Sequence, residues 1–202
     1  MFIKKALLTT TACLLLATSA FSSDSRRFFE STVGPWTVIG HLGDSKNNVN
    51  PACVTHTRWR DGSEFYLIQD LADGELYIDF TNNQWNVRGP YGKDAGNLEL
   101  TINMYRGNTV VESWNAYFTL VDKNTIQVRG IDFRKFLPGF VNMTKIVMVM
   151  PGTIPNAEIS LSNSGRAVNL MTRCMQESDR FIDNKTLDEF NKHRGRGQGR
   201  DA

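Results

Sequence analysis

Leu98-Glu99-Leu100-Thr101-Ile102-Asn103-Met104-Tyr105 is the stretch of this chain that decides its fold class. Apolar side chains alternate there with polar or amphipathic ones, so every second residue falls on the same face of an extended chain. A period of two is typical of an antiparallel strand that has one buried face. The stretch therefore predicts a strand over 98–105.

The same alternation recurs on both sides of this stretch. It predicts further strands at 53–59, 64–71, 75–80, 115–121, 126–128 and 159–161. Residues 145–150 are apolar almost throughout, which predicts a strand buried on both faces. Turn pairs such as Asp61-Gly62 and Asp73-Gly74 separate the runs at a spacing of about ten residues. We expect a mainly β fold, an antiparallel β-sandwich or barrel-like domain.

One segment near the end has helical instead of alternating periodicity. Its apolar residues recur three or four positions apart: Ala167, Leu170, Met171, Cys174 and Met175. We expect a C-terminal helix at about 165–178, packed on the sheet and capped by Ser162 or Ser164. Beyond it, a capping-box pattern and a basic, glycine-rich run predict a short helix and a disordered tail within 184–202.

The N-terminus has the pattern of a secretory signal peptide. Lys4 and Lys5 precede an apolar run over 6–17, and small residues follow at 18–22. We expect 1–22 to be removed on export, 23–32 to be a flexible lead-in and 33–183 to form the β-rich domain. The apolar run is short for a membrane span, and no later segment is long and apolar enough. A retained anchor is the alternative to a periplasmic or secreted protein.

The cysteine count follows from this export. Removal of 1–22 takes Cys13 and leaves Cys53 and Cys174. An even count in an oxidising compartment predicts a disulfide between them, with two free buried thiols as the alternative. The mature chain would carry 21 basic and 21 acidic residues, because Lys4 and Lys5 are lost from 23. A net charge of zero argues against a general nucleic-acid binder.

No pattern of catalytic, metal or cofactor residues stands out. His41, His56 and His193 lack the spacing of a zinc site, and no nucleophile elbow is present. An acidic group suggests either a calcium or carboxylate site or, more simply, a hairpin turn followed by the solvent face of a strand: Asp70, Asp73, Glu75 and Asp79. We expect no metal, no cofactor and no catalytic residue.

The segment 133–143 is the most unusual of the chain. It lacks clean alternation and contains Pro138-Gly139, so we expect a loop. Aromatic and basic residues in it would form a contact patch: Phe133, Arg134, Lys135, Phe136 and Phe140. The alternative is a segment folded back as a lid on the core.

Two stretches carry a resemblance. Gly34-Pro35-Trp36-Thr37-Val38 is similar to the Gly-x-Trp-x-Val start of secreted proteins related to the invasion-associated locus B protein. Residues 159–170, followed by Cys174, resemble the strand, Ser/Gly turn and Ala/Leu-rich helix that end many small periplasmic proteins of Gram-negative bacteria. The resemblance implies a β-sandwich envelope protein without known catalysis, and it transfers no functional residue.

These observations predict a function class. We expect an exported binding or interaction module of the cell envelope, without catalysis, whose partner is an envelope or extracellular protein. One alternative is a periplasmic inhibitor of a hydrolase. Another is an enzyme whose site is assembled from distant strands, which would require a cleft with converging titratable groups.

Overall fold

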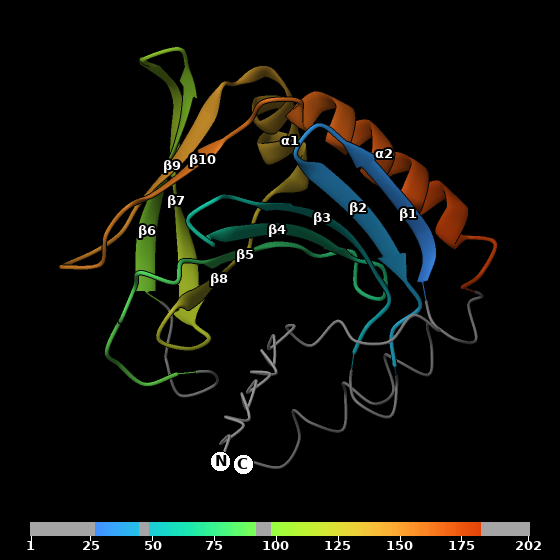
Figure 1. Cartoon of the computed structure of the whole chain (residues 1–202), viewed down its shortest axis with the longest axis horizontal. Helices are drawn as coiled ribbons and strands as arrows, with labels where there is room; N and C mark the ends of the chain where they lie inside the picture. Colours follow the sequence, from blue (N-terminus) through green and yellow to red (C-terminus); the bar gives the residue numbers. More distant parts are fainter. Residues whose placement is uncertain (1–26, 45–48, 92–97, 183–202) are drawn as a thin grey trace, which may run out of the picture.

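The computed structural model describes residues 27–44, 49–91 and 98–182, and these form a single sheet with two helices (Figure 1). The strands are β1 (Arg27–Val33), β2 (Trp36–His41), β3 (Ala52–Arg58), β4 (Glu64–Asp70), β5 (Leu76–Thr81), β6 (Leu98–Arg106), β7 (Thr109–Leu120), β8 (Thr125–Arg129), β9 (Lys145–Val149) and β10 (Ala157–Ser160). The helices are α1 (Phe133–Asn142) and α2 (Ser164–Ser178).

All neighbouring strands of the sheet are antiparallel. Their order is β1-β2-β3-β4-β5-β8-β7-β6-β9-β10. The first five strands pair in chain order, β8 then pairs with β5, and β6 pairs with β9. The prediction of a mainly β, antiparallel fold with a C-terminal helix packed on it is therefore confirmed.

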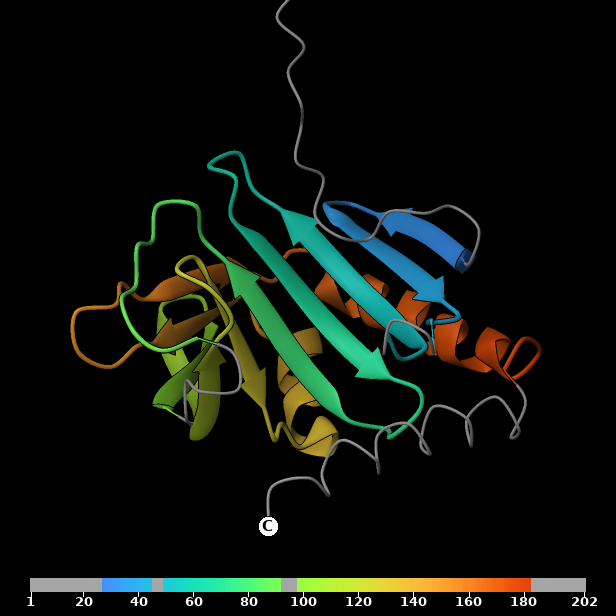
Figure 2. The same cartoon turned by 90° about the horizontal axis from the view of Figure 1, so that it is seen from below.

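Alternation gives the sheet one apolar inner face, and both helices lie on it. In β2 to β5 the residues that point inward include Trp36, Phe65 and Ile78, all fully buried. Phe140 of α1 meets Trp36 edge-on at 5.5 Å between ring centroids and stacks on Phe65 at 6.0 Å. α2 packs against β1, β2 and β3, and seen from below both helices lie behind the sheet (Figure 2). Neither α1 nor α2 covers the other side of β3, β4 and β5, the outer face.

A disulfide fastens α2 to the sheet. Cys53 of β3 and Cys174 of α2 are both fully buried, with their Cα atoms 6.1 Å apart. Cys174 belongs to the buried stripe of α2, together with Ala167, Val168 and Met171. The predicted pairing of Cys53 with Cys174 is confirmed.

The start of α2 differs from the prediction of a serine cap. The N-cap is Asn163, in the left-handed conformation at φ 64°, and its side chain makes no capping hydrogen bond. The two serines are used elsewhere: the Ser164 hydroxyl donates to the Phe140 carbonyl at 2.6 Å, and the Ser162 carbonyl accepts from Trp36 Nε1 at 2.7 Å. These bonds tie the start of α2 to α1 and β2, so tertiary partners replace the local cap.

Two strand predictions need correction. β1 begins at Arg27, inside the stretch 23–32 predicted as a flexible lead-in, because Phe29 and Val33 pack into the core. A register shift between Arg27 and Phe29 interrupts the alternation of inward and outward residues, so the sequence pattern does not reveal this strand. β9 is buried on one face only: Ile146 and Met148 are buried, whereas Lys145, Val147 and Val149 are partly exposed.

Other predictions fall outside the described residues. The signal peptide at 1–22 and the short helix and tail within 184–202 are among them. Across the described ranges, no helix has both the length and the apolar character needed to cross a bilayer.

Candidate binding site

The segment 133–143 is a helix and not the expected loop. Residues 133–142 form α1, and Phe136 and Phe140 are fully buried. Gly139 explains the unusual composition, since a Cβ at this position would overlap the side chain of Met104. Phe136 and Phe140 therefore belong to the core, as in the alternative of a segment folded back on it, and they form no exposed patch. The side chains of Phe133, Arg134 and Lys135 lie outside the described part of the structure.

The outer face of β3, β4, β5 and β8 instead carries the site. Strand register places Val54 opposite Ile68 and Ile68 opposite Tyr77. Two residues beyond Tyr77 along β5, on the same face, Asp79 lies opposite Gln127 of β8. These side chains point away from the helices because their neighbours in each strand point into the core. Residues far apart in the chain thus become adjacent in two parallel rows.

A cavity of about 330 Å³, the outer-face pocket, opens on this surface. Its floor is apolar and consists of Ala52, Val54 and Ile68, which are only 3%, 4% and 5% exposed. These three residues form a small hydrophobic cluster separate from the main core. Polar side chains make up most of the remaining wall: His41, Asn50, Asp70, Glu75, Tyr77, Asp79, Gln127 and Arg129.

Asp79 is a half-buried carboxylate in the wall of the outer-face pocket. Gln127 Nε2 donates to Asp79 Oδ1 at 2.8 Å. Burial raises the pKa of Asp79, and this outweighs the opposing effects of the Gln127 hydrogen bond and the Arg129 charge. Within 27–44, 49–91 and 98–182 the Asp79 carboxylate has no second hydrogen bond, so its other oxygen is available to a donor.

Arg129 and Tyr77 form the side of the outer-face pocket next to Asp79. Arg129 Nε donates to Gln127 Oε1 at 2.5 Å, and the guanidinium carbon lies 5.5 Å from the centroid of the Tyr77 ring. Burial, together with the negative charges of Asp70 and Asp79, raises the pKa of Tyr77. The Tyr77 hydroxyl therefore stays protonated at neutral pH.

Asp70 organises the turn beside the outer-face pocket. Its Oδ1 accepts from the backbone N–H of Ala72 at 2.8 Å and of Asp73 at 3.3 Å, and its Oδ2 accepts from Asn50 Nδ2 at 2.6 Å. Gly74 adopts a positive φ of 75° in the same turn. The hairpin interpretation of the acidic group thus describes Asp70 and Asp73, while Asp70, Glu75 and Asp79 also line the outer-face pocket.

The two histidines of the described residues lie on the outer face. Burial lowers the pKa of His41 in spite of the nearby Asp70 charge, and burial lowers the pKa of His56 in spite of Glu64. Both imidazoles are therefore mainly neutral at pH 7. His56 stacks on the ring of Tyr66 with 4.4 Å between centroids, and its buried Nε2 has no hydrogen-bond partner.

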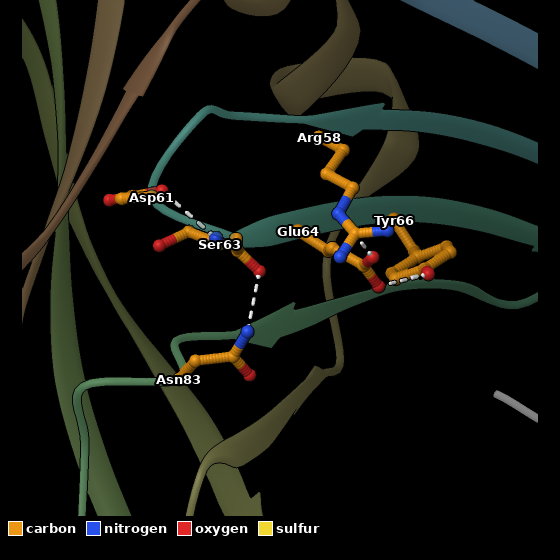
Figure 3. A network of polar contacts seen from close by, with 7 residues as sticks. Arg58, Asp61, Ser63, Glu64, Tyr66 and Asn83 are labelled. Atoms are coloured by element: carbon orange, nitrogen blue, oxygen red, sulfur yellow. Dashed lines mark hydrogen bonds and ion pairs between the residues drawn. The ribbon is translucent and has the colours of Figure 1, made fainter. Parts of the chain in front are cut away.

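A polar network supports the end of the outer face away from the outer-face pocket (Figure 3). Tyr66 Oη donates to Glu64 Oε2 at 2.5 Å, and Glu64 Oε1 also lies 3.2 Å from Arg58 Nε. Asn83 Nδ2 donates to the Gly62 carbonyl at 3.1 Å, which connects the β3–β4 turn to the end of β5. The network thus links β3 to β4 and joins the turn between them to the chain that follows β5.

This arrangement suits a ligand with both an apolar and a polar part. The floor offers aliphatic surface, and the wall offers a carboxylate oxygen, an aromatic ring and neutral imidazole. Among the described residues, no three His, Cys, Asp or Glu side chains are placed to hold a metal ion. The sequence placed Glu75, Tyr77 and Asp79 on the solvent face of a strand. The apolar Val54 and Ile68 on the same face were the signal that a pocket lies there.

Comparison with known proteins yields a weak structural likeness. A scan against models of known protein families found no match, and a search of curated proteins found no similar sequence. Among solved structures the chain is similar to the crystal structure of invasion associated protein b from Bartonella henselae, with a TM-score of 0.48 and 12% identity. The match covers 73% of this chain and 99% of that one. It agrees with the weak resemblance inferred from the sequence, and it assigns a role to no residue.

Proposed function

We propose that this chain is an exported, non-catalytic binding module of the cell envelope that holds its ligand in the outer-face pocket. The observation that carries the proposal is the apolar floor of Ala52, Val54 and Ile68 in a pocket whose other lining residues are mostly polar. A cavity with apolar surface and a few converging polar groups is the usual form of a ligand site.

Rigidity of the surroundings supports a binding role. The outer-face pocket is built on β3, β4, β5 and β8, whose inner faces pack in the main core. The disulfide at Cys53 joins β3 to α2 directly beneath the floor. A site on packed strands loses little conformational entropy when it binds.

Capture of a ligand tests the proposal. A small-molecule extract of the periplasm is added to the ¹⁵N-labelled oxidised protein, and amide chemical shifts are recorded. We expect shifts at the amides around the outer-face pocket. Ala52→Phe fills the floor and should abolish them, whereas Val111→Phe, at a side chain that is 46% exposed on β7, should leave them unchanged.

The same experiment can contradict the proposal. Equal shifts in the Ala52→Phe protein would place the ligand elsewhere, and no shift with any fraction would remove the support for a small-molecule binder. The melting temperature of each variant shows that it is folded.

An enzyme is the second candidate, because one specific observation favours it. His41, Tyr77 and Asp79 line the same pocket, and burial shifts the pKa of each of them. Shifted groups that converge in a cavity are typical of acid–base sites. Mass spectrometry of the bound compound separates the two functions: a binding module returns the ligand unchanged, whereas an enzyme converts it and loses the conversion in Asp79→Asn.

The hydrolase-inhibitor alternative gains no such support from the described residues. It required a loop held rigid by the disulfide, but Cys53 and Cys174 join a strand to a helix and are both fully buried.

A further inference from the structure

We infer that the outer-face pocket takes a small organic cation, an ammonium group carried on a short alkyl chain. The inference rests on the proposed function and adds the chemical class of the ligand. Three features carry it: the charge of the wall, the available oxygen of Asp79 and the apolar floor.

The wall of the outer-face pocket is negative. It contains the three carboxyl groups of Asp70, Glu75 and Asp79 and a single guanidinium, that of Arg129. The imidazole of His41 adds little positive charge because burial lowers its pKa. A cation is therefore attracted to the cavity and an anion of the same size is repelled, and the low local dielectric strengthens both effects.

The Arg129 charge acts on Asp79, but one guanidinium against three carboxyl groups leaves the wall with a net negative charge. Arg129 Nε donates to Gln127 Oε1 at 2.5 Å, and its guanidinium lies 5.5 Å from the Tyr77 ring centroid, on the exposed rim. Gln127 in turn donates to Asp79 at 2.8 Å. The chain Arg129–Gln127–Asp79 orients one oxygen of the Asp79 carboxylate and leaves the other to the cavity.

The carboxylate of Asp79, and not that of Asp70, is the group that would bind the ammonium. Both oxygens of Asp70 accept hydrogen bonds, from Ala72 and Asp73 on one side and from Asn50 on the other. Asp79 accepts a single hydrogen bond within the described ranges. An ammonium N–H would give Asp79 the charge-assisted bond that its second oxygen lacks, and it would offset the burial of the carboxylate.

The apolar floor selects an alkyl chain over a bare ion. Ala52, Val54 and Ile68 present aliphatic surface next to the Tyr77 ring. At about 30 Å³ per water molecule, a cavity of about 330 Å³ has room for roughly eleven waters. A primary amine with six carbons fits that space, and its methylene groups would displace water from the floor.

A charge series on one alkyl chain tests the inference. n-Hexylamine, 1-hexanol and hexanoate are titrated into the oxidised protein by calorimetry near neutral pH, where the amine is protonated. We expect hexylamine to bind about tenfold more tightly than hexanol, as for one charge-assisted hydrogen bond, and hexanoate to bind most weakly.

Two variants give the series its control. Asp79→Asn keeps the shape and should reduce the affinity for hexylamine about tenfold, to that of hexanol. Asp179→Asn removes the same charge from the exposed end of α2, which covers the opposite face of the sheet, and should leave the affinity unchanged. Circular dichroism confirms that both variants are folded.

The outcomes separate the ligand class from the proposed function. If hexanol or hexanoate binds as tightly as hexylamine, or if Asp79→Asn binds hexylamine like the parent protein, the cation inference is wrong while a binding pocket remains. If none of the three probes binds, the ligand class is wrong, and the extract experiment with Ala52→Phe then decides whether the pocket binds anything.

Discussion

Gly40 shows how a single residue can be dictated by the tertiary structure. It lies opposite Cys53 in the β2–β3 register, under the disulfide. A Cβ at this position would lie 2.8 Å from Cys174 Sγ and 2.6 Å from the Phe28 ring. Its backbone needs no positive φ, so the reason for glycine is space and not conformation.

Gly40→Ala should therefore destabilise the protein by about 1–3 kcal/mol through overpacking. The cost should fall by at least about 0.5 kcal/mol when Cys53→Ala and Cys174→Ala remove the sulfur atoms, because the two sites are in contact. Urea unfolding of the four combinations measures this coupling. Gly89→Ala, on an exposed turn where the nearest atom belongs to Leu120, is the matched control. Strictly additive costs would contradict the explanation.

Asp79 gives a pH-dependent prediction at the same scale. Its folded pKa is raised by burial from the ordinary value of 3.8, so between these two values the folded protein keeps a proton that the unfolded chain has lost. Folding is then progressively penalised as the pH rises through this window. Asp79→Asn removes the penalty and keeps the acceptor for Gln127.

Asp79→Asn should accordingly raise the free energy of unfolding at neutral pH, and the gain should vanish below pH 3.8, where the carboxyl group is protonated in both states. Denaturant unfolding at several pH values tests the sign. The exposed Asp179→Asn should show no such trend. A variant that is less stable than the parent at neutral pH would show that the charge of Asp79 is favourable in the folded protein.

At the scale of elements, α1 is the part that sequence patterns misjudged. Pro138-Gly139 and three phenylalanines suggested a loop with a contact patch, but Phe136 stacks on Phe140, and Phe140 meets Trp36 edge-on inside the sheet. Glycine is needed at position 139 because α1 packs so closely on β6 that a Cβ there would overlap the Met104 side chain. A glycine that allows such an approach looks the same in a sequence as one that terminates a helix.

Phe140→Ala should cost about 3–5 kcal/mol of stability, since it leaves a cavity between Trp36 and Phe65. Val141→Ala, at the adjacent and 39% exposed position, should change stability by less than about 0.5 kcal/mol. Thermal unfolding compares the two. A stable Phe140→Ala protein would mean that α1 does not pack on the core as described.

α2 depends on the sheet for its position. The loop closed by the disulfide spans 121 residues, and the chain-entropy model gives about 5 kcal/mol for it, an upper figure. We expect the Cys53→Ala/Cys174→Ala protein to lose about 2–5 kcal/mol, measured by urea unfolding under oxidising conditions. Reduction of the parent protein should lower its stability to the same value. A double variant as stable as the oxidised parent would contradict a structural role for the bond.

At the scale of the whole molecule, one wide sheet separates two environments. The inner face, with α1 and α2, forms the main core, and the outer face keeps a second, small cluster at Ala52, Val54 and Ile68. The disulfide lies between them, on the inner side of β3. Disulfides are typical of proteins in oxidising compartments, in agreement with the predicted export.

Export itself is a prediction for the intact chain. Expressed with its own N-terminus in a Gram-negative host, the protein should appear in the periplasm without residues 1–22. Intact-mass analysis should find no alkylated thiol unless a reductant is added first, because Cys53 and Cys174 are paired. An uncleaved leader in the cytosol, or two alkylated thiols in exported material, would contradict this prediction.

The sequence by itself determined the fold class, most strands, the C-terminal helix and the disulfide, because alternation, helical spacing and cysteine parity are local or countable properties. The edge strand β1, the helix α1 and the outer-face pocket were decided only in the tertiary structure. Each depends on contacts between residues that are far apart in the chain. Phe29 packs in the core, Gly139 lies against Met104, and Ile68 lies between Val54 and Tyr77. Alternation assigns a residue to a face of its own strand. The register between strands, which brings Asp79 to Gln127 and assembles the site, arises from packing over the whole sheet.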